Sequence, residues 1–346
     1  MPKQTVFRLP TRTSIDDLSS LEEDMPTVSK HEVLIKIRAV ALNSRDIQVA
    51  TDTYPMPCRD NIIPCSDGAG DVIEVGEGVR NIEKGDRVVI NFDIAHLYGA
   101  RQGDETCQGG YIDGVLAQYV VRPATSVVRV PSTARQSYSE LASLVCTGVT
   151  AWNGLFGNVP LKPGQSVLVQ GTGGVSISAL VIAKAAGATT IVTSSSNEKL
   201  EKVKAKFHPD FCINYKEYPE WGSRARELLG GEGVDHVIEI GGPGTFEQSI
   251  EALAFGGMIS VIGYLASSDP AKMPNVLLLA LRKAAIVRGI LTESVCMLQE
   301  LVTFVDRTGV KLPVEKEFGF TRDEVLRAYK ELESGGGFGK VCIRLD

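Results

Sequence analysis

The stretch that decides the fold is SVLVQGTGGVSISALVIAKAAGATTIVTSSSNEK, residues 166–199. Its apolar start, Ser166–Gln170, predicts a strand that runs into a glycine-rich turn. Small and apolar residues over Ile177–Ala186 predict a helix, and Thr189–Thr193 predicts a second strand. This is the order of a dinucleotide-binding βαβ unit. Glycines let the backbone approach a pyrophosphate, and the helix N-terminus offers free N–H groups to it.

The glycine turn by itself is a weak signal, because Ser176 replaces the third glycine of the dinucleotide pattern. An ordinary strand-to-helix turn that binds nothing is the alternative interpretation. The periodicity on both sides of the turn favours nucleotide binding, with Gly171, Gly173, Gly174 and Val175 nearest the phosphates.

The end of the second strand indicates which nucleotide is bound. An NAD site usually places Asp or Glu about 20 residues after the first glycine, where it accepts from the ribose 2′-hydroxyl. This chain instead has Ser194, Ser195 and Ser196, followed by Lys199. Hydroxyls and an ammonium suit a 2′-phosphate, so we expect NADPH rather than NADH. Ser195 or Ser196 can also be the N-cap of the next helix with Lys199 solvated, and the two roles are compatible.

Composition limits the class of protein. The chain has 346 residues, of which 43% are hydrophobic and 23% charged, enough for two domains with their own cores. A net charge of −6 disfavours a nucleic-acid partner, and no apolar run reaches the ~18–20 residues of a membrane span. Seven cysteines without C-x-x-C pairs suit reduced thiols, and the N-terminus lacks a secretory signal, so we expect a cytoplasmic location.

The chain divides into two patterns. Residues 1–130 show mainly strand signals and predict a small β-barrel, whereas residues 165–291 alternate strand and helix and predict a doubly wound parallel sheet. Expected strands of the first part are Glu32–Ala41, Ala69–Val75, Arg87–Asn91 and Leu116–Arg122, followed by a helix over Ser139–Phe156. Expected strands of the second part are Val167–Gln170, Thr190–Thr193, Phe211–Asn214, Val234–Ile240, Met258–Ile262 and Ala285–Ile290. Two later helices and a last strand, Lys340–Leu345, return the chain to the first domain.

This organisation resembles the medium-chain dehydrogenase/reductase superfamily over nearly the whole chain. The matching motifs are Asn43-Ser44-Arg45-Asp46 (N/C-x-x-D), Pro64–Gly76 (G-H-E-x-x-G-x-V-x-x-V-G), Lys84–Val88 (K-x-G-D-R-V), Leu144–Thr150 (L-x-C-A-G-x-T) and Gly339-Lys340-Val341 (G-K-V). The resemblance implies an α/β fold with a GroES-like β-barrel catalytic domain, residues 1–134 and 298–346. Residues 135–297 would form a Rossmann domain that binds NADP(H), and the strand Ile286–Ile290 would be the edge of a homodimer.

The chain departs from the family at the zinc ligands. A zinc alcohol dehydrogenase of this superfamily has Cys at position 43, His at 66 and Cys at 146, where this chain has Asn43, Ser66 and Cys146. One thiolate with an amide and a hydroxyl does not hold zinc tightly. The structural zinc lobe needs four cysteines near residues 94–112, and only Cys107 is present. We therefore expect neither metal, as in the quinone oxidoreductase and alcohol dehydrogenase-like members that lack zinc. The loop Phe92–Gly114 would then shape the pocket or simply cover the barrel.

Without zinc, hydrogen-bond donors must stabilise the oxygen on which negative charge grows after hydride transfer. We expect Tyr54 and Asn43 to supply them, with Tyr54 or solvent giving the proton, and Asp46 and Ser66 as further candidates. The alternatives are loop packing for Tyr54 and backbone bonding for Asn43 and Asp46. A weaker oxyanion site favours enals, enones and quinones over simple ketones or alcohols.

The resemblance also extends the cofactor site. Asn214 and Tyr215 match a segment whose tyrosine approaches the adenosine 2′-phosphate in related reductases. Positions after strand ends and in the matched motifs complete the expected set: Thr150, Gly241, Gly263, Tyr264, Ile290, Leu291, Gly339 and Lys340.

Three functions stay open. The first is an NADPH-dependent, zinc-independent reductase of an activated alkene or a quinone. The second is an NADP(H)-dependent alcohol or aldehyde oxidoreductase that uses protein donors. The third is a non-catalytic NADPH-binding protein.

Overall fold

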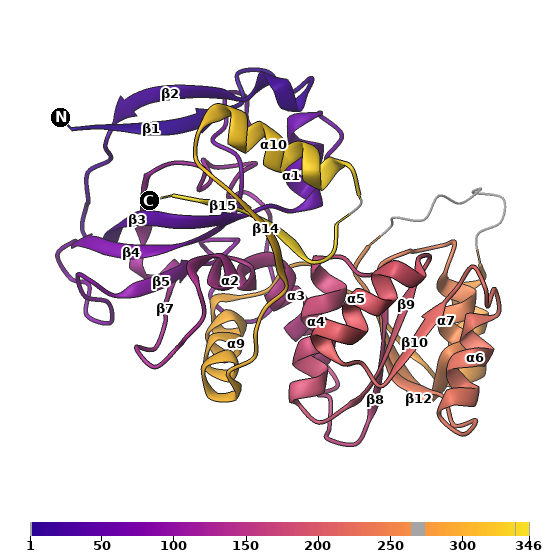
Figure 1. Ribbon diagram of the computed structural model, residues 1–346. Coiled ribbons are helices and arrows are strands. Elements are labelled where there is room, and N and C mark those ends of the chain that lie inside the picture. Colours follow the sequence, from indigo (N-terminus) through magenta and orange to yellow (C-terminus); the bar gives the residue numbers. More distant parts are fainter. Residues whose placement is uncertain (1, 264–273, 336, 346) are drawn as a thin grey trace. The chain divides into compact units, whose positions relative to one another are not determined.

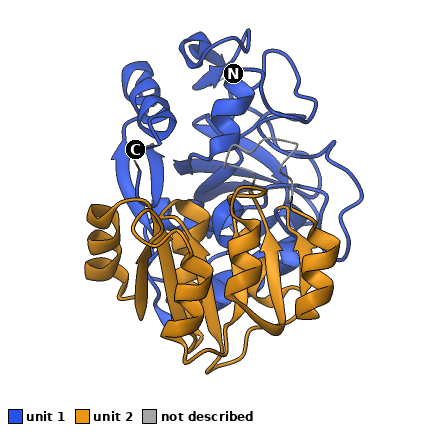
Figure 2. Ribbon diagram, turned by 90° about the vertical axis from the view of Figure 1, so that its right-hand side faces the viewer, with its two compact units in different colours: residues 1–149, 292–346 blue, residues 150–291 orange. Residues whose placement is uncertain are grey.

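The computed structural model describes residues 2–263, 274–335 and 337–345. The chain forms two compact units, residues 1–149 with 292–346 (unit 1) and residues 150–291 (unit 2) (Figure 2). These units divide at 149/150 and 291/292, whereas the sequence-based boundaries lie at 134/135 and 297/298. The difference arises because the helical segment after residue 137 packs on the strands of unit 1.

Unit 2 is a parallel sheet in the order β10-β9-β8-β11-β12-β13, which confirms the expected doubly wound fold. Figure 1 shows helices α4 and α5 on one side of these strands and α6 and α7 on the other. The strands are β8 (Ser166–Gln170), β9 (Thr189–Ser194), β10 (Phe211–Asn214), β11 (Val234–Glu239), β12 (Leu253–Val261) and β13 (Ile286–Gly289). The helices are α3 (Val149–Phe156), α4 (Gly174–Ala185), α5 (Asn197–Phe207), α6 (Trp221–Leu228), α7 (Phe246–Ala252) and α8 (Val276–Lys283).

Unit 1 is a seven-stranded, mainly antiparallel sheet in the order β14-β15-β3-β4-β5-β7, with β6 also paired to β3. A separate hairpin joins β1 and β2. The strands are β1 (Lys3–Arg8), β2 (Ser19–Asp24), β3 (Glu32–Ala41), β4 (Asp67–Val75), β5 (Arg87–Ile90), β6 (Tyr119–Pro123), β7 (Val127–Arg129), β14 (Val314–Phe318) and β15 (Lys340–Arg344). The helices are α1 (Ser44–Ala50), α2 (Tyr138–Ala142), α9 (Val295–Thr308) and α10 (Arg322–Glu333).

The core of unit 1 lies under this curved sheet. Alternate residues of the strands, such as Ile35, Ile37, Val72 and Val88, are buried in one apolar cluster. Helix α10 closes the cluster with Tyr329, whose ring is fully buried. The sheet therefore holds the starts of α1 and β4, which carry the predicted catalytic residues, on a rigid support.

The predicted helical segment Ser139–Phe156 is present, but it is not one regular α-helix. Helix α2 ends at Ala142, and a π-helical turn, Leu144–Gly148, precedes α3. The Gly148 N–H donates to the carbonyl of Ser143 at 3.1 Å, five residues back. Such bulges often mark functional sites, and this one carries Cys146.

Four strands have no counterpart in the sequence-based expectations: β1, β2, β7 and β14. They are three to six residues long, and β2 reads SSLEED, without an apolar alternation. Strand pairing at the sheet edges, rather than local pattern, determines them. Within the described residues, no helix combines the length and apolarity that a membrane crossing requires.

We predict that Gly70 is required where β4 pairs with β3. A Cβ atom at this position would lie 2.1 Å from the carbonyl oxygen of Lys36, so the strands must move apart. Gly70→Ala should lower the free energy of unfolding by about 1–3 kcal/mol in urea denaturation. The matched control is Gly319→Ala, whose added Cβ meets its nearest atom at 3.7 Å. Equal effects of the two substitutions would contradict this packing argument.

Candidate active site

The glycine turn after β8 has the geometry of an anion site. Gly171 has a φ of +72°, and Gly173 is the N-cap of α4 without a side-chain capping bond. No atom lies within 4 Å of the place where a Cβ of Gly173 would be. The first N–H groups of α4 are therefore available to a phosphate. The buried hydroxyl of Ser176 donates to the carbonyl of Gln170 at 2.5 Å and so stabilises the turn.

A second turn, after β11, is held by a buried carboxylate. Glu239 is fully buried, and its Oε1 accepts from the N–H groups of Gly241 and Gly242 at 2.8 and 2.9 Å. The same oxygen accepts from Thr245 Oγ1 at 2.6 Å, and Oε2 accepts from Gln170 Nε2 at 2.7 Å. Because five donors converge on this carboxylate, with Ser249 Oγ as the fifth, the β8 and β11 turns are tied together. The sequence-based argument missed Glu239 and Gln170.

These turns border a cavity of about 540 Å³, a size typical of small-molecule sites. It lies at the carboxyl ends of the parallel strands, where ligands of open α/β sheets bind. Among the expected cofactor residues, Gly171, Tyr215 and Gly241 line it. Its other lining residues are Gln170, Thr193, Pro219, Trp221, Ile240, Gly244, Thr245 and Gln248.

The end of β9 carries the expected serines. Ser196 is the N-cap of α5 and accepts from the Lys199 N–H at 3.3 Å, whereas the Ser194 hydroxyl accepts from the N–H of Ser196 at 3.3 Å. Glu198 lies on the exposed side of α5, where its carboxylate pairs with Lys202 at 2.7 Å. Glu198 is therefore no substitute for the missing ribose-binding acid at the strand end.

Asn214 differs from Tyr215 in what its side chain does. The Asn214 amide donates to Asn197 Oδ1 at 2.8 Å and accepts from the N–H of Lys216 at 3.0 Å, so it shapes the turn after β10. Glu217 accepts from Asn197 Nδ2 at 2.5 Å in the same turn. Tyr215 is 41% exposed and free of such turn contacts through its ring.

In unit 1 the predicted catalytic residues gather around Asp67, the first residue of β4. Its fully buried carboxylate accepts from Ser66 Oγ at 2.6 Å and from the N–H of Cys146 at 3.2 Å. The ammonium of Lys340 lies 3.8 Å from the same group. Lys340 also donates to Asn43 Oδ1 at 2.7 Å, so four elements meet at one carboxylate. Asp67 was not among the residues expected from the sequence.

Lys340, expected among the cofactor residues, has partners within unit 1. Its buried ammonium donates to the carbonyl of Leu42, at 2.6 Å, and to the amide oxygen of Asn43. An ammonium can only donate, so it fixes the Asn43 amide with the oxygen toward Lys340. Asn43 Nδ2 then points away from Lys340, is buried and makes no hydrogen bond of normal geometry.

Burial controls the protonation of this cluster. It raises the pKa of Asp67, while Lys340 opposes that shift. Loss of water and the neighbouring Asp67 raise the pKa of Cys146 to about 12, so its sulfur is a thiol at neutral pH. Burial also raises the pKa of Asp46 to about 6. Asp46 accepts from the N–H of Asn43 at 2.7 Å, the backbone role foreseen as an alternative, and its Oδ1 has no partner.

Tyr54 stands beside an arginine that the sequence argument did not assign. The guanidinium carbon of Arg45 lies 4.9 Å from the ring centres of both Tyr54 and Phe92. Its Nη1 donates to the carbonyl of Gln108 at 2.9 Å. Partial burial raises the pKa of Tyr54, and the charge of Arg45 opposes that shift. Tyr54 is therefore neutral and a hydrogen-bond donor at physiological pH.

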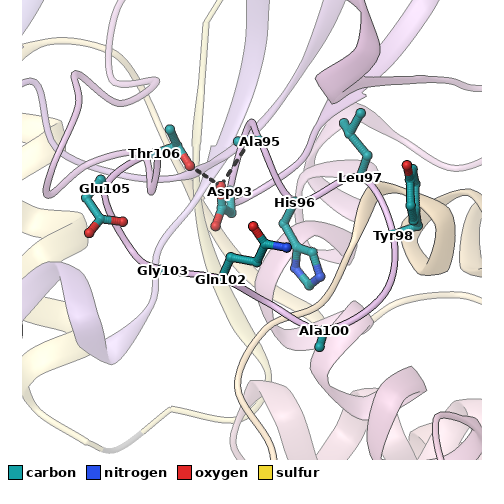
Figure 3. Close-up of a pocket in the computed structure, with 10 residues that line it drawn as sticks. All are labelled: Asp93, Ala95, His96, Leu97, Tyr98, Ala100, Gln102, Gly103, Glu105 and Thr106. Atoms are coloured by element: carbon teal, nitrogen blue, oxygen red, sulfur yellow. Dashed lines mark hydrogen bonds between the residues drawn. The ribbon is translucent and has the colours of Figure 1, made fainter.

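The loop that takes the place of the zinc lobe is held by Arg101. This guanidinium reaches Asp93 at 3.4 Å and Asp104 at 2.6 Å, and it contacts the sulfur of Cys107. Figure 3 shows Asp93 bonded to Thr106 and to the Ala95 N–H. The loop also lines a cavity of about 410 Å³.

The donors at the two family zinc positions do not fit zinc. Among residues 2–263, 274–335 and 337–345, no three His, Cys, Asp or Glu side chains converge as a metal site. At the catalytic position, the Lys340 ammonium lies against Asn43 and Asp67, and the Cys146 thiol holds its proton. A cation in the middle of the donor set opposes a divalent ion electrostatically.

The remaining expected cofactor residues lie as follows. Thr150 and Ile290 are buried, whereas Leu291 is 67% exposed. Gly263 needs to be glycine, because a Cβ would lie 2.5 Å from the carbonyl of Ile240. Tyr264 lies outside the described residues.

Comparison with known proteins agrees with this architecture. Residues 174–307 match a family described as zinc-binding dehydrogenase, and residues 29–132 match the alcohol dehydrogenase GroES-like domain. A zinc-type alcohol dehydrogenase-like protein of Schizosaccharomyces pombe is 42% identical, over 96% of this chain and 97% of its own length. An acryloyl-coenzyme A reductase of Metallosphaera sedula is 33% identical, over 69% of this chain and 70% of its own. A solved structure from Sinorhizobium meliloti 1021, assigned as an alcohol dehydrogenase, is 37% identical with a TM-score of 0.90 and covers 100% of both chains.

An α/β protein with a GroES-like unit and a nucleotide-binding parallel sheet is an oxidoreductase of the dehydrogenase type. The chain belongs to the medium-chain dehydrogenase/reductase superfamily, which confirms the resemblance seen in its motifs. Members of this family bind a nicotinamide cofactor, and the cradle at Gly171–Gly174 fits its pyrophosphate.

The buried carboxyl of Asp46 should make stability depend on pH. Its pKa is about 6 in the folded protein and about 3.9 in an unfolded chain. Between about pH 4 and 6 the folded state therefore keeps a proton that the unfolded state has lost, so stability falls as pH rises, by up to about 2–3 kcal/mol. Asp46→Asn should flatten this slope in urea unfolding, leaving the contribution of Asp67, whose pKa burial also raises. An unchanged slope in the variant would contradict the assignment.

Proposed function

We propose that this protein is an NADPH-dependent, zinc-independent reductase that transfers hydride to an activated alkene, an enal or enone, or to a quinone. The observation that carries the proposal is the Asp67 cluster. Where a zinc dehydrogenase has its metal ligands, a lysine ammonium, an amide, a hydroxyl and a protonated thiol surround one buried carboxylate.

The cofactor preference rests on the end of β9. Ser194, Ser195 and Ser196 follow the strand without a carboxylate, and Glu198 is occupied by Lys202. Lys199 lies in the first turn of α5, and Tyr215 adds a half-exposed ring. Hydroxyls, an ammonium and the N-terminus of α5 together favour a 2′-phosphate over a 2′-hydroxyl.

When bound, NADPH supplies a hydride from C4 of its nicotinamide ring. Hydride addition to the β-carbon of an enone moves the alkene electrons onto the carbonyl oxygen, and a proton then joins the α-carbon. We assign Tyr54 as the donor to that oxygen, an assignment supported by its neutral phenol and by its packing beside Arg45. Asn43 contributes as a second donor only through Nδ2, because Lys340 occupies its oxygen.

The chemistry of these donors sets the substrate class. Neutral hydrogen-bond donors stabilise an oxyanion less than a Lewis-acidic metal does. An enolate or a hydroquinone anion spreads its charge by conjugation and needs less stabilisation than an alkoxide. Activated alkenes and quinones are therefore better acceptors for this site than saturated aldehydes or ketones.

An alcohol or aldehyde oxidoreductase is the second candidate. The relative in Schizosaccharomyces pombe is named a zinc-type alcohol dehydrogenase-like protein, and it matches 96% of this chain. A non-catalytic NADPH-binding protein is the third, and it would show cofactor binding without turnover.

The test is NADPH and NADH oxidation with matched enals, saturated aldehydes and quinones, followed by product analysis. We expect turnover with NADPH and saturation of the C=C bond or reduction of the quinone. Exclusive conversion of aldehydes to alcohols would replace this proposal with the second candidate. Tighter binding of NADH than of NADPH would overturn the cofactor assignment.

We predict that Tyr54→Phe lowers kcat by roughly 10–1000-fold if the phenol donates in the transition state. KM should change less, because the ring and its stacking on Arg45 remain. Tyr218→Phe, at a half-exposed tyrosine of unit 2, is the matched control. An unchanged kcat in Tyr54→Phe would remove the phenol from the mechanism.

We also propose that the protein is a homodimer through the β13 edge of unit 2. β13 ends the sheet order, so one row of its backbone groups is unpaired within the described residues. The neighbouring α8 buries none of its residues, and Leu277 and Leu281 are 85% and 78% exposed. Leu277→Glu with Leu281→Glu should convert a dimer into a monomer in light scattering. A monomeric unmodified protein would refute this interface.

A further inference from the structure

We propose that Arg45 is a substrate-binding residue that pairs with a carboxylate on the substrate, so that the acceptor is an unsaturated or quinonoid acid rather than a neutral molecule. This inference rests on the proposed reductase function, but it concerns a group that the hydride-transfer step does not use. It deepens that function by naming the charge of the substrate.

Arg45 is held in one position by four neighbours in unit 1. The rings of Tyr54 and Phe92 lie at 4.9 Å from its guanidinium carbon, and Gln108 accepts from Nη1 at 2.9 Å. The fourth neighbour is Gly110, whose lack of a side chain makes room for Nη2, since a Cβ there would lie 2.4 Å from this nitrogen. Stacking and lack of space thus fix the fork before any ligand arrives, which lowers the entropy lost on binding.

The positive charge of Arg45 is not neutralised by a close acid. Across the described ranges, no carboxylate oxygen lies within 4.0 Å of the Arg45 nitrogens, and Nε is buried without a partner. The carboxyl of Asp46 acts on Arg45 by its charge from beyond this ion-pair distance. An arginine keeps its charge at any physiological pH, so this guanidinium is a cation without a close carboxylate.

Arg101 shows what a structural arginine looks like in the same region. Its guanidinium also approaches the Phe92 ring, at 5.9 Å, yet Asp93 and Asp104 pair with it at 3.4 and 2.6 Å. Arg45 has the same ring and none of these acids. A planar guanidinium that has no close carboxylate within the described residues matches a carboxylate in geometry and charge, which is why we assign the missing acid to the ligand.

The test compares an acid with its own ester. The probes are 4-oxopent-2-enoate and methyl 4-oxopent-2-enoate, which differ in charge but share the same conjugated alkene. We expect a lower KM for the acid with the unmodified protein. Arg45→Met should raise KM for the acid by roughly 10–100-fold, the loss of a charge-assisted hydrogen bond, and affect the ester much less. Arg45→Lys should recover part of the preference for the acid. Arg129→Met, at an exposed arginine paired with Asp86, is the control.

A binding measurement separates this inference from the proposed reaction. Titration calorimetry with the saturated acid 4-oxopentanoate needs no turnover, and its affinity should fall in Arg45→Met. Carboxylate binding that depends on Arg45 without reduction of any alkene would overturn the reductase proposal and leave the carboxylate site standing. Reduction of acid and ester with equal KM, or an equal loss for both in Arg45→Met, would overturn the carboxylate site and show that the arginine only braces Tyr54 and Phe92.

Discussion

The need to satisfy one fully buried carboxylate organises unit 1. Asp67 begins β4, and no solvent reaches it, so its charge must be met by groups of the protein. Ser66 donates from the preceding residue, Cys146 donates from the π-helical turn, and Lys340 approaches from β15. These groups lie far apart in the chain. The carboxylate therefore fixes the register of β15 and the irregular turn between α2 and α3 as well as the candidate site.

In unit 2, a second buried carboxylate holds together residues around the cavity at the strand ends. Glu239 is also fully buried, but N–H and O–H dipoles rather than a lysine satisfy it. Its donors come from the turn after β11 and from the side chain of Gln170 at the end of β8. Two loops that border the nucleotide cavity are thereby held rigid, which preserves the shape of the cavity in the absence of ligand.

The distribution of positive charge at this site supports the proposed zinc-independent chemistry. The ammonium of Lys340 contacts Asn43 and Asp67, and the guanidinium of Arg101 pairs with Asp93 and Asp104. Arg45 alone among these three cations has no close carboxylate within the described part of the chain. A cation of this kind attracts an anionic ligand to the site. The attraction between the two charges becomes stronger as water is excluded. The proposed reductase chemistry and the proposed carboxylate preference therefore rest on one electrostatic arrangement.

The sequence by itself determined the two-domain α/β architecture, because strand and helix periods are local properties of the chain. It located the glycine turn at Gly171–Gly174 and brought Asn43, Ser66 and Tyr54 forward as candidates. Only the tertiary structure showed that Asp67 is the common partner of Ser66, Cys146 and Lys340, since those residues are 1, 79 and 273 positions away. It also showed the hydrogen bond from Lys340 to Asn43, and it revealed that Arg45 lies beside the rings of Tyr54 and Phe92. Long-range packing determines which side chains become partners, which are buried and which charges stay unpaired. A local sequence pattern does not contain this information.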